Sequence, residues 1–210
     1  SNGVSKWITG SAARADVQKY RASHCALITG VETILVDDPS LNVRYETLGE
    51  LTTRHTKDEF FQPLRVVLDS RARLTATQQL FSIQSPILLV SGCHYPESVK
   101  AEFPEHVSFL QLTCDSSGRI PLLALLTYLG QHANSVLVEA GATLAGAFVA
   151  QGLVDEVVLY QAPKILGSHG RNMLQLPDYS TMEQTPALQL IDERNVGQDK
   201  RYILRYNQPY

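Results

Sequence analysis

The segment from Val136 to Phe148 constrains the fold most: a short apolar run leads into a glycine turn and a helix of small residues. Val136 to Val138 are typical of a buried strand, Gly141 allows a sharp turn, and Thr143 to Val149 have helical spacing. The first N–H groups of such a helix are free to bind phosphate. The segment therefore predicts an α/β fold with an anion site, although the same turn also occurs as a plain connection.

Two acidic residues stand where a ligand crevice is expected. Glu139 follows the strand directly, and the carboxyl ends of strands in open α/β sheets face the crevice. Pro39 keeps Asp38 out of the helical region, which leaves Asp37 at a bend where its carboxylate can point into a cleft. Glu139 and Asp37 are the candidate catalytic residues.

The composition is that of one globular domain. The chain has 210 residues, 44% of them hydrophobic, and needs no metal or disulfide to fold. The net charge of −3 shows no long block of one sign, which argues against nucleic acid or a membrane surface as the main partner. Three separated cysteines indicate reduced thiols in a cytoplasmic protein, and no spacing typical of metal ligands occurs.

Apolar runs alternate with helical segments and predict a mainly parallel sheet. We expect helices at 12–22 and 121–129 and strands at 25–30, 64–69, 86–91, 107–112 and 155–161. In the first helix, Asp16 is expected on the outer, solvent-facing side. The strands at 187–191 and 202–206 are expected to form an antiparallel pair, joined through residues 197–200.

Cationic and hydroxyl side chains mark candidate phosphate sites. Arg21 and Arg44 flank the Asp37 bend, and two guanidinium forks suit one substrate phosphate, unless both only pair with surface acids. Ser70 and Arg71 follow a strand and suit the ribose 2′-phosphate of NADPH, although a solvated basic turn has the same composition. Trp7, the one tryptophan, either stacks on a ligand ring or packs at the sheet edge.

Several of these segments occur together in one known family. The motifs in question are Ser5 to Gly10, Asp16 to Arg21, Thr33 to Arg44, Asp69 to Arg71, Val138 to Gly146, Leu153 to Glu156 and Ala162 to Gly167. Taken in this order, they resemble the reductase domain of the bifunctional deaminase/reductase of riboflavin biosynthesis, the RibD family. The resemblance spans nearly the whole chain.

The resemblance implies a fold similar to dihydrofolate reductase, with a mainly parallel sheet, flanking helices and an antiparallel strand pair near the end. It implies an enzyme that uses NADPH to reduce the ribosyl group of 5-amino-6-(5-phospho-D-ribosylamino)uracil to ribityl. Other readings remain open: a reductase of another pyrimidine or of a pterin, or a non-catalytic nucleotide-binding fragment.

The resemblance also assigns residues. It implies cofactor contacts at Trp7, Thr33, Asp37, Ser70, Arg71, Gly141, Ala142, Thr143, Leu144, Ala145, Gly146 and Ala147. It implies substrate contacts at Ser5, Arg21, Leu41, Arg44 and Glu139, with the two arginines at the phosphate and Glu139 near the ribosyl group.

The chain departs from the family pattern at its start. Family members begin the reductase domain with a strand of the form Lys-x-Ala-x-Ser-x-Asp-Gly, and we expect residues 1–210 to be the reductase domain without that central strand. The zinc signature of the upstream deaminase does not occur either, so that domain is expected only in the parent protein, fused to this one. The family also implies a homodimer.

Overall fold

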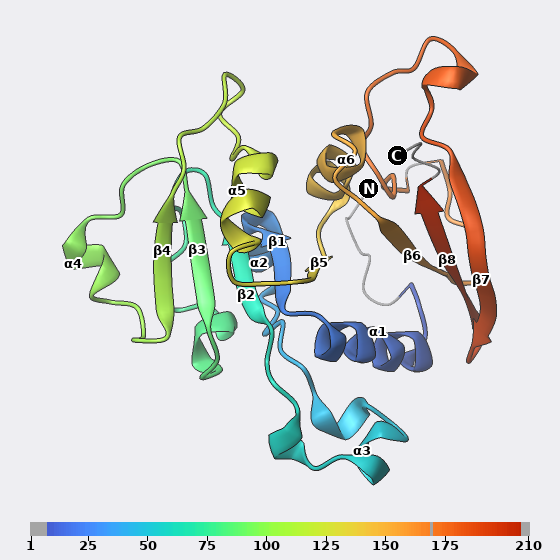
Figure 1. The fold of residues 1–210 in the computed structure, drawn as a ribbon, viewed down its shortest axis with the longest axis horizontal. Helices are drawn as coiled ribbons and strands as arrows, with labels where there is room; N and C mark the ends of the chain where they lie inside the picture. The colour runs from blue at the N-terminus through green and yellow to red at the C-terminus, as the bar shows by residue number, and fades with distance from the viewer. Residues whose placement is uncertain (1–7, 169, 207–210) are drawn as a thin grey trace.

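The computed structural model describes residues 8–168 and 170–206, and these residues form two sheets (Figure 1). The larger sheet is parallel and has the strand order β4-β3-β2-β1-β5, and the smaller is antiparallel and has the order β6-β8-β7. The strands are β1 (Ala26–Gly30), β2 (Leu64–Leu68), β3 (Ile87–Ser91), β4 (Val107–Gln111), β5 (Val136–Val138), β6 (Glu156–Gln161), β7 (Leu188–Val196) and β8 (Asp199–Tyr206). The predicted parallel sheet is confirmed.

Helices cover both faces of the larger sheet. They are α1 (Ser11–Ser23), α2 (Val31–Asp37), α3 (Leu51–Arg54), α4 (Glu97–Lys100), α5 (Leu122–Leu129) and α6 (Ala142–Ala150). In Figure 1, α5 lies in front of the sheet and α2 behind it. Because both faces of this sheet are covered, residues on both sides of its strands are apolar, and the strands appear in the sequence as continuous apolar runs.

The sheet separates two hydrophobic cores because side chains alternate along each strand. Leu27, Val67 and Leu89 point to one face, where Ile34 of α2 packs. The other core consists of side chains from the alternate strand positions together with α5 and α6; it includes Ile28, Val66, Leu88, Leu125 and Phe148. All of these residues are buried, so the carboxyl ends of the strands are held in one fixed edge.

The smaller sheet is larger than the sequence predicted. The antiparallel pairing of the last two strands is confirmed, but each is longer than expected, and β6 joins them by pairing with β8. Polar residues such as Asp192 and Asn195 lie within β7 because much of this sheet is exposed, so the strands lack the apolar pattern that marks β1 to β3. The turn uses Gly197, whose φ of 65° favours glycine.

Helix α1 joins the two sheets through a buried acid. The sequence placed Asp16 on the outer side of α1, and this prediction is wrong: Asp16 is only 7% exposed. Its Oδ2 accepts hydrogen bonds from Arg201 Nη1 and from the Tyr160 hydroxyl, both at 2.8 Å. Both donors belong to the smaller sheet, more than a hundred residues away in sequence, which is why a local helical pattern could not reveal them.

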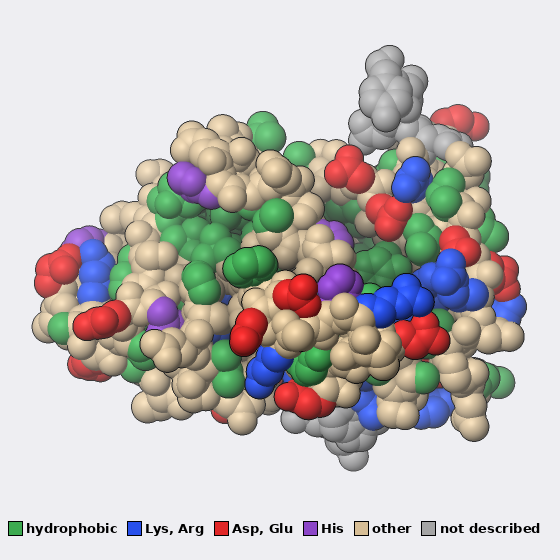
Figure 2. Space-filling model, turned by 60° about the horizontal axis from the view of Figure 1, so that its bottom comes forward, with side chains coloured by type: hydrophobic (Ala, Val, Ile, Leu, Met, Phe, Trp, Pro, Cys, Tyr) green, Lys and Arg blue, Asp and Glu red, His purple; other side chains and the backbone are tan. Residues whose placement is uncertain are grey.

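Membrane-spanning helices and metal-ligand clusters are absent from the described residues. Within residues 8–168 and 170–206, no helix is long and apolar enough to cross a membrane. In the same described part of the chain, no cluster of three His, Cys, Asp or Glu side chains could hold a metal ion. Figure 2 shows a face on which acidic and basic side chains are intermixed.

Asp16 gives the folded protein an acid-sensitive contact. Burial alone raises the pKa of Asp16, but the hydrogen bonds from Tyr160, Arg201 and Lys19 outweigh it and leave the pKa below its ordinary value. The unfolded chain therefore binds the proton first as the pH falls, and this part of the stability, present at higher pH, is lost as the pH drops from about 4 through the lowered pKa.

We predict that Asp16→Asn lowers the free energy of unfolding by about 2 kcal/mol near neutral pH, because the charged contact with Arg201 is lost. The difference from the wild-type chain should narrow below about pH 4, where the wild-type carboxylate also loses its charge. Urea unfolding across this range measures both effects. The exposed Asp178→Asn is the control, and an equal loss at every pH would contradict the assignment.

Candidate functional site

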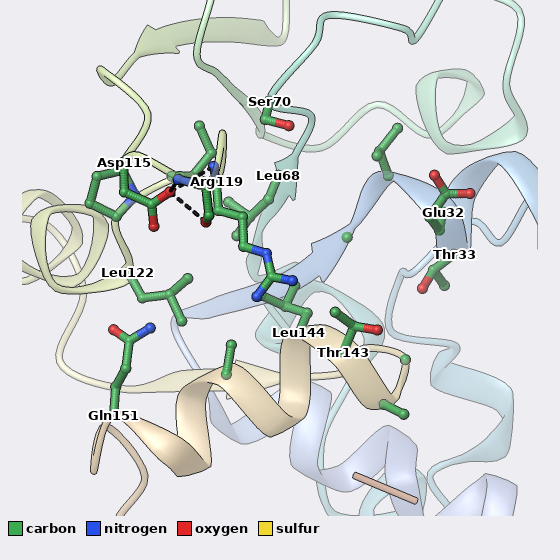
Figure 3. A pocket seen from close by; sticks show the side chains of 18 of the residues that line it. Glu32, Thr33, Leu68, Ser70, Asp115, Arg119, Leu122, Thr143, Leu144 and Gln151 are labelled. Atoms are coloured by element: carbon green, nitrogen blue, oxygen red, sulfur yellow. Dashed lines mark hydrogen bonds between the residues drawn. The ribbon is translucent and has the colours of Figure 1, made fainter. Parts of the chain in front are cut away.

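A cavity of about 750 Å³ opens at the carboxyl ends of β1 and β2 (Figure 3). The first turns of α2 and α6 form one side, and the segment 115–123 forms another. The volume lies within the range of about 300–1,000 Å³ that is usual for small-molecule and cofactor sites. The cavity therefore lies at the sheet edge where the sequence predicted a ligand.

The glycine turn forms the α6 wall of the cavity. Gly141 is the extended N-cap of α6, and the cavity is lined by Gly141, Ala142, Thr143, Leu144 and Ala147. The backbone N–H groups at the start of this nine-residue helix lack partners within the helix and favour an anion. The predicted glycine turn and helix start are present and line the cavity, and their role in binding phosphate stays a prediction.

Two residues of the same motif lie elsewhere. Ala145 and Gly146 do not line the cavity. Gly146 is buried against the backbone of Gln175, with which a Cβ at this position would collide. Gln175 also donates its N–H to Ala142 O at 2.9 Å. The missing side chain of Gly146 thus allows the segment around Gln175 to pack on α6, a packing requirement that the sequence did not distinguish from ligand binding.

The other predicted cofactor contacts divide into two groups. Thr33 and Ser70 line the cavity, whereas the exposed Arg71 does not. Asp37 lies one helical turn beyond Thr33 on α2, exposed and outside the cavity. Trp7 and Ser5 lie outside the described residues. Asp37 and Arg71 stay predictions on sequence grounds only.

A carboxylate and a guanidinium meet beside the cavity. Arg21 Nε donates to Glu139 Oε1 and Arg21 Nη2 donates to Glu139 Oε2, each at 2.7 Å. The two side chains are 11% and 22% exposed, so the pair is shielded while still reachable from solvent. The paired geometry fixes the plane of the carboxylate. Two predicted substrate residues, far apart in sequence, are thereby brought together.

The segment 40–44 packs beside this pair. Arg21 Nη1 donates to Asn42 O at 3.0 Å, and Arg44 N donates to Gln18 Oε1 at 2.9 Å. Gln18 lies one helical turn before Arg21, so Arg44 and Arg21 are held near the same face of α1. These contacts hold the Arg44 backbone near α1, while the Arg44 side chain is exposed. The meeting of both guanidinium groups at one phosphate stays a prediction.

Leu41 adopts a strained conformation within this segment. Its φ is 52°, in the left-handed region that is costly for a residue with a Cβ, and its side chain is 3% exposed. Such strain persists only where surrounding contacts impose it, and it concentrates at functional sites. The side chain packs in the hydrophobic core, and the substrate role of Leu41 stays a prediction.

The side chain of Arg65 in β2 binds the backbone of this strained segment at Ser40. Its side chain is fully buried within β2, and its guanidinium donates to the carbonyl oxygens of Ser40, Leu80, Ile83 and Ser85 at 2.7–3.0 Å. Burial lowers the pKa of Arg65 to about 10, which leaves it charged at neutral pH. The sequence showed only a cation inside an apolar strand and did not identify this role.

The comparison with protein families decides the relationship. The model of the family described as the RibD C-terminal domain matches residues 1–201. The chain belongs to this family.

Relatives agree over almost the whole chain. The riboflavin biosynthesis protein RibD of Haemophilus influenzae is 40% identical over 201 residues, which cover 95% of this chain and 52% of the relative. A protein of Buchnera aphidicola named 5-amino-6-(5-phosphoribosylamino)uracil reductase is 34% identical, and the match covers 97% of this chain and 97% of that protein. The solved structure of Acinetobacter baumannii RibD is 36% identical, with a TM-score of 0.83, over 99% of this chain and 54% of that one.

These matches fix the fold and the extent of the likeness. The larger parallel sheet and the antiparallel sheet are those of the RibD reductases, which share the dihydrofolate-reductase-like fold that the sequence predicted. The chain spans about half the length of the curated RibD relatives that it matches.

One wall of the cavity was not predicted from the sequence. Residues 115–123 follow β4 and reach the cavity with Arg119, Ile120 and Leu122. The signal was present: a turn-forming run, Asp115-Ser116-Ser117-Gly118, follows a strand of the parallel sheet, so it ends at the same edge as Ser70. Arg171, from the loop after β6, lines the cavity as well.

We predict that Arg65→Met lowers the free energy of unfolding by about 3 kcal/mol, because four buried carbonyl oxygens lose their donor. The matched change Arg71→Met, on the exposed turn after the same strand, should stay within about 0.5 kcal/mol of the wild-type value. Denaturant unfolding followed by circular dichroism measures both. Equal stabilities for the two variants would show that the Arg65 contacts do not hold the segment.

Proposed function

We propose that this domain uses NADPH to reduce the ribosyl group of 5-amino-6-(5-phospho-D-ribosylamino)uracil to ribityl, a step of riboflavin biosynthesis. One observation carries the proposal: the end of β5 supplies both Glu139, held by Arg21, and Gly141, which begins the anion-binding wall of the cavity. A carboxylate and a nucleotide site thus share one strand end. The name of the Buchnera relative supports the same substrate.

The residues of the cavity fit a dinucleotide. The N-terminus of α6 suits its pyrophosphate, and Thr33 and Ser70 supply hydroxyl groups on the opposite walls. The apolar side chains of Leu68, Ile120 and Leu122 suit a base. When bound, NADPH would supply a hydride to the sugar carbon.

The substrate phosphate fits the two arginines. Within the described residues, the Arg21 guanidinium donates to Glu139 and to Asn42, which leaves one N–H donor on each Nη atom. The exposed Arg44 lies near the same face of α1 and suits a second contact with the phosphate. The Leu41 side chain is buried in the core, so the substrate contact proposed for this residue would come from its strained backbone.

Glu139 would handle a proton at the ribosyl group. Opening of the sugar ring breaks the bond between C1′ and the ring oxygen, and the ring oxygen takes up a proton from solvent. The amine nitrogen loses its own proton as it forms an imine with C1′. Hydride addition at C1′ then requires a proton at that nitrogen. A carboxylate fixed by Arg21 can accept and return this proton, and its orientation is set before substrate binds. Asp37 is retained as a second candidate acid.

We also infer that the complete domain holds one more strand between β5 and β6. In the described part of the chain, β5 pairs only with β1 and β6 only with β8. Figure 1 shows the strands in the order β4-β3-β2-β1-β5 and then β6-β8-β7 across the molecule, so a strand in this position would join the two sheets. The half-buried side chains of both edge strands support this.

The parent protein is proposed to be cytoplasmic, with a fused deaminase domain. The double length of the RibD relatives supports the fusion. We propose a homodimer as well, because β7 is an outer strand whose Leu188, Leu190 and Ile191 are 40–50% exposed.

The proposed activity is tested by following NADPH oxidation with the ribosylaminopyrimidine phosphate. The chain as it stands is compared with a form extended upstream by the additional strand, and NADH replaces NADPH in a parallel set. Turnover with NADPH in the extended form is expected, and the chain alone should be much slower. Turnover only with a pterin would favour another substrate, and NADPH binding without any turnover would favour a binding role.

We predict that Glu139→Gln lowers kcat by at least about 100-fold while the dissociation constant of NADPH changes less than about twofold, because the amide cannot take up the proton. The exposed Glu105→Gln serves as the matched control and should leave both constants unchanged. Steady-state kinetics and direct titration of NADPH supply the two numbers. An equal loss of turnover and of NADPH affinity would exclude a role for Glu139 in proton transfer.

A further inference from the structure

The side chain of Arg119 lines the cavity, and no role for it was predicted from the sequence. Figure 3 shows its side chain extending from the turn after β4 across the cavity toward Thr143 and Leu144 of α6. Among the described residues, its guanidinium has no hydrogen-bond or ion-pair partner, and the residue is exposed. The side chain therefore faces the cavity without a fixed partner from the protein.

The turn that carries Arg119 is rigid. Asp115 Oδ1 accepts the N–H of Ser117 at 2.8 Å and that of Arg119 at 3.0 Å, and Asp115 N donates to Arg119 O at 2.9 Å. The Ser117 hydroxyl, these N–H groups and the Arg119 charge hold the pKa of Asp115 below its ordinary value. Asp115 Oδ1 is thus occupied by groups of the turn, and the carboxylate makes no hydrogen bond to the Arg119 guanidinium among the described residues.

The charges around the cavity are arranged for an anion. The N-terminus of α6 carries a partial positive charge, and Arg119 extends toward it, so two positive groups share the cavity. Their repulsion is relieved when a phosphate lies between them. Arg171 adds a third positive group to the lining. Glu32, an acidic residue of the same lining, is already paired with Arg73.

We propose that Arg119 binds a phosphate group of the nucleotide in this cavity and thereby takes the role that the sequence assigned to Arg71. The inference rests on the proposed function. Ile120 and Leu122 follow Arg119 in the chain and give the same wall an apolar surface, which suits the adenosine half of the cofactor. Arg71 does not line the cavity.

Two phosphates of that half share this chemistry, and two probes distinguish them. The compound 2′,5′-ADP carries the ribose 2′-phosphate and lacks the pyrophosphate, whereas ADP carries the pyrophosphate alone. Both are titrated calorimetrically into the folded chain, into Arg119→Gln and Arg119→Lys, and into Arg71→Gln as the matched control. These arginines are exposed, so the variants should fold like the wild-type chain.

Arg119→Gln is expected to weaken the binding of at least one probe by about tenfold or more, because a charged donor to phosphate is lost. Arg119→Lys should weaken the binding less, because it keeps the positive charge on a shorter side chain. A loss confined to 2′,5′-ADP assigns Arg119 to the 2′-phosphate, and a loss confined to ADP assigns it to the pyrophosphate. The affinity of the Arg71→Gln control should stay within about twofold of the wild-type value.

Two results would overturn the inference. If Arg119→Gln binds both probes as tightly as the wild-type chain does, Arg119 does not bind the phosphate. If only Arg71→Gln loses affinity, the phosphate is bound by Arg71, as the sequence predicted. If the wild-type chain binds NADPH while Arg119→Gln is unaffected, only this inference fails. If the wild-type chain binds neither the probes nor NADPH, the cofactor assignment fails with it.

Discussion

The paired hydrogen bonds between Arg21 and Glu139 join segments that are 118 residues apart in sequence, and the candidate site depends on them. Arg21 lies in the last turn of α1, the helix whose buried Asp16 is bound to the smaller sheet, while Glu139 follows the edge strand of the larger one. Helix α1 therefore fixes the position of Glu139 relative to both sheets. Any disturbance of α1 is transmitted to the carboxylate, because the carboxylate plane is set by the Arg21 fork.

The same pair connects two chemically different regions. On one side, the start of α6 and the first turn of α2 line a cavity that suits a nucleotide. On the other side, Asn42 accepts a hydrogen bond from Arg21, and the strained Leu41 lies next to it. Arg65 binds the Ser40 carbonyl from within the sheet, so the core itself supports the strain.

Much of the larger sheet could be predicted because its determinants are local. Buried parallel strands are continuous apolar runs, and the Gly141 turn needs only its own few residues to be recognised. The pairing of Arg21 with Glu139 and the burial of Asp16 depend on partners far along the chain, which spacing cannot reveal.

The residues Arg65 and Arg119 were missed for a related reason. A single arginine in a strand or turn forms no periodic pattern, and its role is decided by what the fold places around it. The exposed strands β7 and β8 lacked the apolar pattern that would have given their full length.

The central claim is that a hydride reaches the ribosyl carbon beside Glu139, and its most direct test follows the hydride itself. The complete domain is supplied with NADPH that carries deuterium at both C4 positions of the nicotinamide ring, so that either hydride is labelled, and the pyrimidine product is analysed by mass spectrometry and NMR. Deuterium should appear at C1′ of the new ribityl chain. Oxidation of the labelled NADPH without deuterium at C1′, or no ribityl product from a domain that binds NADPH, would contradict the claim.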